Sequence, residues 1–146
     1  MRRSTWACWA ALFVLFFSGS ARAAEQTQNS VRLGDVVVHY SAVRSDFFAP
    51  QVARQYGFVR SSTRAVLTVS LLRGKAAIPG QVTASAEYPS GQPFVIPLRE
   101  IREGDAIYYL GDFRVQAPVT LKFHVDVRPE GAESMHRVSF NQTFYP

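Results

Sequence analysis

The chain has 146 residues, of which 47% are hydrophobic and 18% are charged, and its formal net charge is +5 at pH 7. A chain of this length can bury one sizeable core, so we expect a single domain. Three basic residues lie among the first 23. Without Arg2, Arg3 and Arg22, the 16 basic residues fall to 13 against 11 acidic ones, a net charge of +2. This nearly neutral remainder argues against nucleic acid or an anionic surface as the partner.

The N-terminal segment has the features of a secretory signal peptide. Two arginines precede an apolar run at residues 6–17, and Ala21 and Ala23 occupy the −3 and −1 positions of a cleavage site. We expect cleavage after residue 23, which leaves a mature domain of residues 24–146. An uncleaved anchor is the alternative, but the run is shorter than the roughly 20 residues that span a membrane. The predicted location is therefore the periplasm, and secretion beyond the outer membrane stays open.

The single cysteine bears on how the mature domain is stabilised. Cys8 lies inside the apolar run and would leave with the signal peptide. We therefore expect no disulfide, and a domain that depends on core burial for its stability. We also expect no cofactor.

Apolar and polar residues alternate along most of the mature chain, which predicts strands. About seven are expected, at residues 31–43, 65–72, 82–88, 94–98, 105–113, 119–127 and 135–144. Pro97 cannot donate a ladder hydrogen bond, so the fourth strand belongs at a sheet edge. Short antiparallel strands of this number predict an all-β sandwich of the immunoglobulin or fibronectin type, with a small barrel as the alternative. Tyr109 has the position of a tyrosine corner, in which the phenol bonds to upstream backbone, and Tyr108 competes for that role.

One short helix is predicted within residues 45–58, between the first two long strands. Ser45 or Asp46 is suited to cap it, Pro50 to occupy its first turn, and Gly57 to end it in the left-handed conformation. We expect this helix to cover an open end or edge of the sandwich.

Three segments, "YGFVRSSTRAVLTVSLL", "REIREGDAIYYL" and "FNQTFYP", together resemble a family of small exported proteobacterial proteins that is catalogued as a domain of unknown function. The resemblance spans essentially the whole mature chain. It implies an exported β-sandwich of a Gram-negative bacterium, and it implies no catalytic or binding residues.

The segment after the helix carries the candidate ligand-binding residues, which are Arg60, Ser61, Ser62 and Arg64. Guanidinium groups bind planar anions bidentately, and hydroxyls add donors, so this set could hold a carboxylate, a phosphate or an anionic sugar. The alternative is structural: an arginine bonded to helix C-terminal carbonyls, or paired with an acid such as Asp46, Glu100 or Asp105.

Metal binding has weaker candidates in His39, His124 and His136, which are predicted on three different strands. A periplasmic copper carrier is therefore kept as an alternative function, although no Cys-x-x-Cys or His-x-His pattern is present.

The sequence contains no recognised catalytic motif, and a hydrolase is the least favoured alternative function. Glu100, Glu103 and Asp105 could supply a carboxylate pair, but Arg99 and Arg102 would hold their pKa values down. We therefore predict a non-enzymatic binding or accessory module of the cell envelope. Its partner would be another envelope protein, bound by strand addition at the Pro97 edge or through the helix, or a small anionic ligand.

Overall fold

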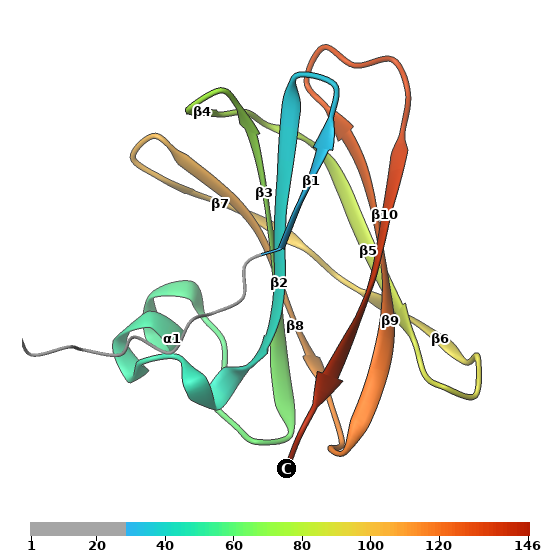
Figure 1. Ribbon diagram of the computed structural model, residues 1–146. Coiled ribbons are helices and arrows are strands. Elements are labelled where there is room, and N and C mark those ends of the chain that lie inside the picture. The colour runs from blue at the N-terminus through green and yellow to red at the C-terminus, as the bar shows by residue number, and fades with distance from the viewer. Residues whose placement is uncertain (1–28) are drawn as a thin grey trace, which may run out of the picture.

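The computed structural model describes residues 29–146 (Figure 1). The predicted signal peptide, residues 1–23, lies outside the described residues. Two antiparallel sheets pack face to face, as the alternation predicts for a β-sandwich. Neither of the two short helices within residues 29–146 is long and apolar enough to span a membrane.

The six-stranded sheet has the order β1-β2-β3-β8-β7, and a short strand, β4, pairs with β3. Its strands are β1 (Asn29–Leu33), β2 (Val36–Arg44), β3 (Arg64–Arg73), β4 (Ala76–Ala77), β7 (Arg99–Glu103) and β8 (Ala106–Arg114). The four-stranded sheet has the order β10-β9-β5-β6. Its strands are β5 (Gly80–Glu87), β6 (Pro93–Ile96), β9 (Val119–Pro129) and β10 (His136–Phe144).

Residues 29–146 form ten strands rather than about seven, and the three additional strands are β1, β4 and β7. The predicted strand 31–43 is the hairpin β1–β2, which turns at Gly34 with a φ of 61°. The sequence does not predict β7, because four of the five residues at 99–103 are charged, and β4 has only two residues. Strand β6 lies at an edge of the four-stranded sheet, as Pro97 predicts, and Pro97 itself begins the crossing to β7.

The core lies between the sheets and is made by the alternate residues that the sequence placed inward. Phe123 is fully buried and stacks on Phe140, with ring centroids 4.8 Å apart. Tyr109, not Tyr108, takes the tyrosine-corner role: its buried phenol accepts a hydrogen bond of 2.9 Å from the Gly80 N–H. This bond joins β8 to the start of β5 and so ties the two sheets together.

The helix differs from its prediction in its start and in its position. Ser45 and Asp46 begin a separate 3₁₀ turn, η1 (Ser45–Phe47), and the residue before α1 (Pro50–Tyr56) is Ala49, which has no capping side chain. Gly57 ends the helix in the left-handed conformation, as predicted, with a φ of 70°. The helix does not cover an end or edge. It packs on the outer face of the six-stranded sheet (Figure 1). Apolar residues of β3 and β8 point outward there and contact the helix.

Candidate functional site

The six-stranded sheet splits between β3 and β8, at the end that carries the β3–β4 and β7–β8 turns. These strands pair from Arg64↔Arg114 to Val69↔Tyr109 and no further. Beyond that point β3 pairs with β4, while β8 forms a hairpin with β7. The opening holds a hollow of about 450 Å³, which we name the split hollow. Its lining comes from four strands and two hairpin turns: His39, Ser70, Leu72, Lys75, Ala77, Asp105, Ala106, Ile107 and Tyr108.

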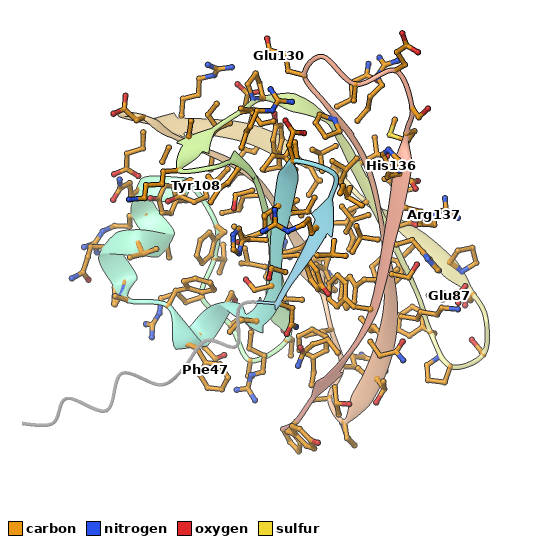
Figure 2. The ribbon with its side chains drawn as sticks, turned by 45° about the horizontal axis from the view of Figure 1, so that its top comes forward. Phe47, Glu87, Tyr108, Glu130, His136 and Arg137 are labelled. Atoms are coloured by element: carbon orange, nitrogen blue, oxygen red, sulfur yellow. The ribbon has the colours of Figure 1, made fainter. Side chains whose placement is uncertain are left out.

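A second hollow of about 130 Å³ lies between α1 and the outer face of the same sheet, and we name it the helix groove. Its lining is mainly apolar: Ser41, Phe48, Val52, Tyr56, Phe58, Thr68, Ile101, Tyr108 and Leu110. Tyr108 lines both hollows, so the two adjoin. In Figure 2, Tyr108 lies on the side of the molecule that carries α1, opposite Glu87 and Arg137.

Helix α1 is fastened to β7 by polar contacts at its C-terminal end. The Glu103 carboxylate accepts hydrogen bonds from Gln55 Nε2 at 3.1 Å and from the Tyr56 hydroxyl at 2.5 Å. This hydrogen bond, more than burial, raises the pKa of Tyr56 to about 12. Arg99 donates to the Tyr56 carbonyl. The groove therefore has one wall held in place by charge-assisted bonds.

The structure gives Arg60 main-chain partners. Its Nε donates to the Phe48 carbonyl at 2.6 Å and its Nη2 to the Asp46 carbonyl at 2.9 Å. These bonds hold the segment that leads into α1. The expected arginine at the helix C-terminal carbonyls is present, but it is Arg99 rather than Arg60.

The hydroxyl run forms a joint with η1. The fully buried Ser45 hydroxyl accepts from the Ser61 N–H at 2.9 Å and donates to the Ser61 carbonyl at 3.1 Å. The Ser61 hydroxyl in turn accepts from the Thr63 N–H at 3.1 Å. Ser62 is exposed, and Arg64 forms an ion pair with Asp112 across the β3–β8 pair. Arg60 and Arg64 thus have different protein partners, and their role in binding an anion stays a prediction.

Of the three acids that the sequence offered as partners, Asp46 and Glu100 are paired with other arginines. Asp46 is bonded to Arg44, which lowers the pKa of that carboxyl. Glu100 is bonded to Arg102, and this hydrogen bond likewise lowers its pKa, as expected from the arginines around it. A carboxyl with a lowered pKa is poorly suited to act as a general acid.

The three histidines lie apart. His39 lies on β2 in the split hollow, whereas His124 lies on β9, on the outer face of the opposite sheet, and bonds to Ser139 at 2.9 Å. His136 begins β10 (Figure 2). Within residues 29–146, no group of three or more His, Cys, Asp or Glu side chains is placed to hold a metal ion.

An exposed aromatic pair, which the sequence did not predict, lies at the end of the sandwich opposite the split hollow. Phe47 and Tyr145 are 69% and 70% exposed and line one hollow of about 240 Å³. Arg44 joins them: its guanidinium lies 5.1 Å from the Phe47 ring centroid and donates to the Tyr145 carbonyl at 2.7 Å. No periodicity signals this pair, because it forms where η1 meets the C-terminus.

The fold and the two adjoining hollows define a small β-sandwich that carries a groove on one outer face. The chain belongs to the family described as Domain of unknown function (DUF4426), whose model matches residues 30–146. It is similar to the crystal structure of a DUF4426 family protein from Pseudomonas aeruginosa PAO1, with 33% identity and a TM-score of 0.74 over 84% of this chain and 98% of that one. The resemblance seen in the sequence is confirmed. No match was found among curated proteins.

Two solved structures of FetP from uropathogenic Escherichia coli strain F11 are also similar in fold. A copper-bound variant has 12% identity and a TM-score of 0.53, over 80% of this chain and 94% of that one. The protein as isolated has 11% identity and a TM-score of 0.54, over 81% and 93%. At these identities the likeness concerns the fold alone.

Proposed function

We propose that this chain is a non-enzymatic binding or accessory module of the cell envelope, and that its partner occupies the helix groove. The observation that carries the proposal is the apolar groove itself, on a sheet face that a sandwich usually presents to water as polar side chains. Apolar concavities with a few polar groups are the usual form of binding sites. The hydroxyls of Ser41, Thr68 and Tyr108 are such polar groups.

The arrangement of titratable groups supports a binding role over a catalytic one. The split hollow is lined by His39, Lys75, Asp105 and Tyr108, and none of these side chains forms a hydrogen bond or ion pair with another. Nucleophilic catalysis requires a nucleophile within hydrogen-bond reach of its base. The Ser139 to His124 bond meets that distance, but it lies on the open outer face of β9 and β10.

Export to the periplasm, as a mature domain of residues 24–146, is part of the proposal. It is supported by the arginines, the apolar run and the small-residue cleavage site at residues 1–23. The family match begins at residue 30 and covers the rest of the chain, in keeping with a domain that starts after the leader.

Copper carriage remains the alternative, and it has less support. FetP, which has a similar fold, has been solved with copper bound. In this chain the three histidines lie on different strands and on both sheets. Metal analysis of the purified exported protein tests this alternative: stoichiometric copper would favour it over the proposal.

An anionic ligand at Arg60, Ser61, Ser62 and Arg64 also remains a proposal of its own. Replacing both arginines by alanine and comparing the partners captured from envelope extracts tests it. Equal capture by the wild type and the double variant would assign the arginines to structure only.

The experiment for the groove uses two arginine substitutions on one helix. Val52 lines the groove, whereas Gln51 is exposed. The full chain is expressed with its own leader, purified, and mixed with the apolar fluorophore 1-anilinonaphthalene-8-sulfonate. We expect Val52→Arg to abolish the fluorescence increase and the capture of an envelope partner, and Gln51→Arg to preserve both. Equal behaviour of the two variants would refute the groove as the binding site.

A further inference from the structure

We propose that the split hollow receives an extended peptide segment of a partner protein, paired main chain to main chain between β4 and β8, with a bulky apolar side chain in the helix groove. This inference rests on the proposed function and names the chemistry of the partner. Strand addition of this kind takes its affinity from main-chain hydrogen bonds and its specificity from side-chain pockets.

The first open main-chain edge belongs to β8. Glu103 and Ala106 are paired across a two-residue turn, so they exchange their N–H and C=O bonds. Bonding alternates along an antiparallel pair, so the N–H and C=O of Ile107 point away from β7. On that side, pairing with β3 begins only at Tyr109. Within residues 29–146, no strand pairs with Ile107 from the side of the hollow.

The second open edge faces the first one and belongs to β4. Arg73 and Ala76 are paired across another two-residue turn, so the N–H and C=O of Ala77 point away from β3. Strand β2 occupies the other side of β3 along this length, which places β4 on the side of β8. Ala77 and Ile107 both line the split hollow. A strand between them would bond to both.

The size of the opening suits such a strand. One strand residue occupies about 160 Å³, given a rise of about 3.3 Å, a strand spacing of about 4.8 Å and a sheet spacing of about 10 Å. The split hollow, at about 450 Å³, therefore holds about three residues. Asp105 lies at the mouth of the split hollow and Leu110 lines the helix groove. The distance between them along β8 is five residues, or about 17 Å. A ligand that reaches both hollows must be that long, which excludes a single amino acid and fits a pentapeptide.

The charges at the mouth match a peptide that carries both signs. Lys75 at the β3–β4 turn and Asp105 at the β7–β8 turn line the same hollow, and within residues 29–146 neither forms an ion pair. An acidic residue of the segment would face Lys75 and a basic one Asp105. The deep end, next to Tyr108, accepts the apolar side chain.

The test is an amide NMR titration of the isotopically labelled full chain, expressed with its leader. The probes are acetyl-Phe-Thr-Ser-Glu-Lys-amide and its reversed sequence, since the strand direction is open. We expect one of them to shift the amide signals of Ala77 and Ile107. N-methylation of alternate residues, which removes main-chain donors, should weaken binding at least tenfold, as should replacing the peptide phenylalanine by alanine.

Two tyrosine substitutions serve as matched variants. Ser70→Tyr places a ring in the split hollow, whereas Thr83→Tyr places one on the exposed outer face of β5. We expect at least tenfold weaker peptide binding for the first variant and less than a twofold change for the second.

The outcomes separate this inference from the proposed function. Unweakened binding of the N-methylated peptide, or shifts remote from Ala77 and Ile107, would overturn the strand pairing. If neither peptide binds while the fluorophore still binds at the helix groove, the inference of a peptide partner is overturned and the proposed function of the groove stands. Shifts that appear on raising the protein concentration alone would identify a second copy of this chain as the occupant and overturn the partner peptide.

Discussion

Replacing Ser45 by alanine tests whether the segment after α1 is a structural joint. Ser45 is fully buried, and its hydroxyl bonds to both the N–H and the carbonyl of Ser61. The change removes both hydrogen bonds, at about 1 kcal/mol each, and leaves the Ser61 N–H without its partner, whereas the Ser61 carbonyl still accepts from the Arg64 N–H; we therefore expect the free energy of unfolding to fall by about 2 kcal/mol. With an unfolding entropy of about 2.1 cal/mol/K per residue over the described domain, the melting temperature should fall by about 8 °C.

The matched control is Ser62→Ala, because Ser62 lies in the same segment and is exposed. Its free energy of unfolding should change by less than about 0.5 kcal/mol. Urea unfolding followed by circular dichroism measures both variants, and it suits a mature domain in which no tryptophan is expected. If the Ser45→Ala variant is as stable as the wild type, or if both variants are equally destabilised, the interpretation of this segment as a structural joint is refuted.

Three further changes have defined outcomes. Gly111→Ala should destabilise the domain by about 1 to 3 kcal/mol, because the new Cβ would lie 2.5 Å from a backbone carbonyl of the β6–β7 connection; wild-type stability in thermal unfolding would contradict this contact. Tyr109→Phe should cost about 1 to 2 kcal/mol through its lost bond to the start of β5, and Tyr108→Phe much less; equal melting temperatures would argue against the tyrosine corner. The Arg137 guanidinium lowers the pKa of Asp126, so this pair stabilises the fold above the ordinary carboxyl pKa and the effect is lost as the pH falls below about 4. Asp126→Asn should therefore flatten the stability profile in that range, and an unchanged acid limb would contradict the pairing.

The sandwich follows from the sequence because alternation reports burial directly. Leu121, Phe123 and Val125 are all completely buried, as their positions along one strand require. The turn at Gly34 was missed because the apolar pattern continues through it, so two strands looked like one. The helix was found from its Pro50 and Gly57 signals, but its position depends on which sheet face offers apolar contacts.

The groove and the split hollow were beyond prediction for a related reason. The split hollow exists because β3 and β8 part at Val69 and Tyr109, and the groove exists because α1 packs on the outer face of the same sheet. The pairing register between distant strands is not written in either strand alone. One signal was present. Val66 and Leu110 are apolar on the parity expected to face water, which indicates that something covers that face. The sequence singled out Arg60 and Arg64 instead, and these residues lie in the segment that positions the helix.

Site-specific photo-cross-linking in living cells tests most directly whether a partner occupies the groove. Tyr108 lines both hollows, and Thr83 is exposed on the opposite sheet. With p-benzoylphenylalanine at position 108, illumination should give one discrete cross-linked product, and with the same probe at position 83 it should give none. No product at position 108, or the same products at both positions, would contradict a binding module that works through this groove.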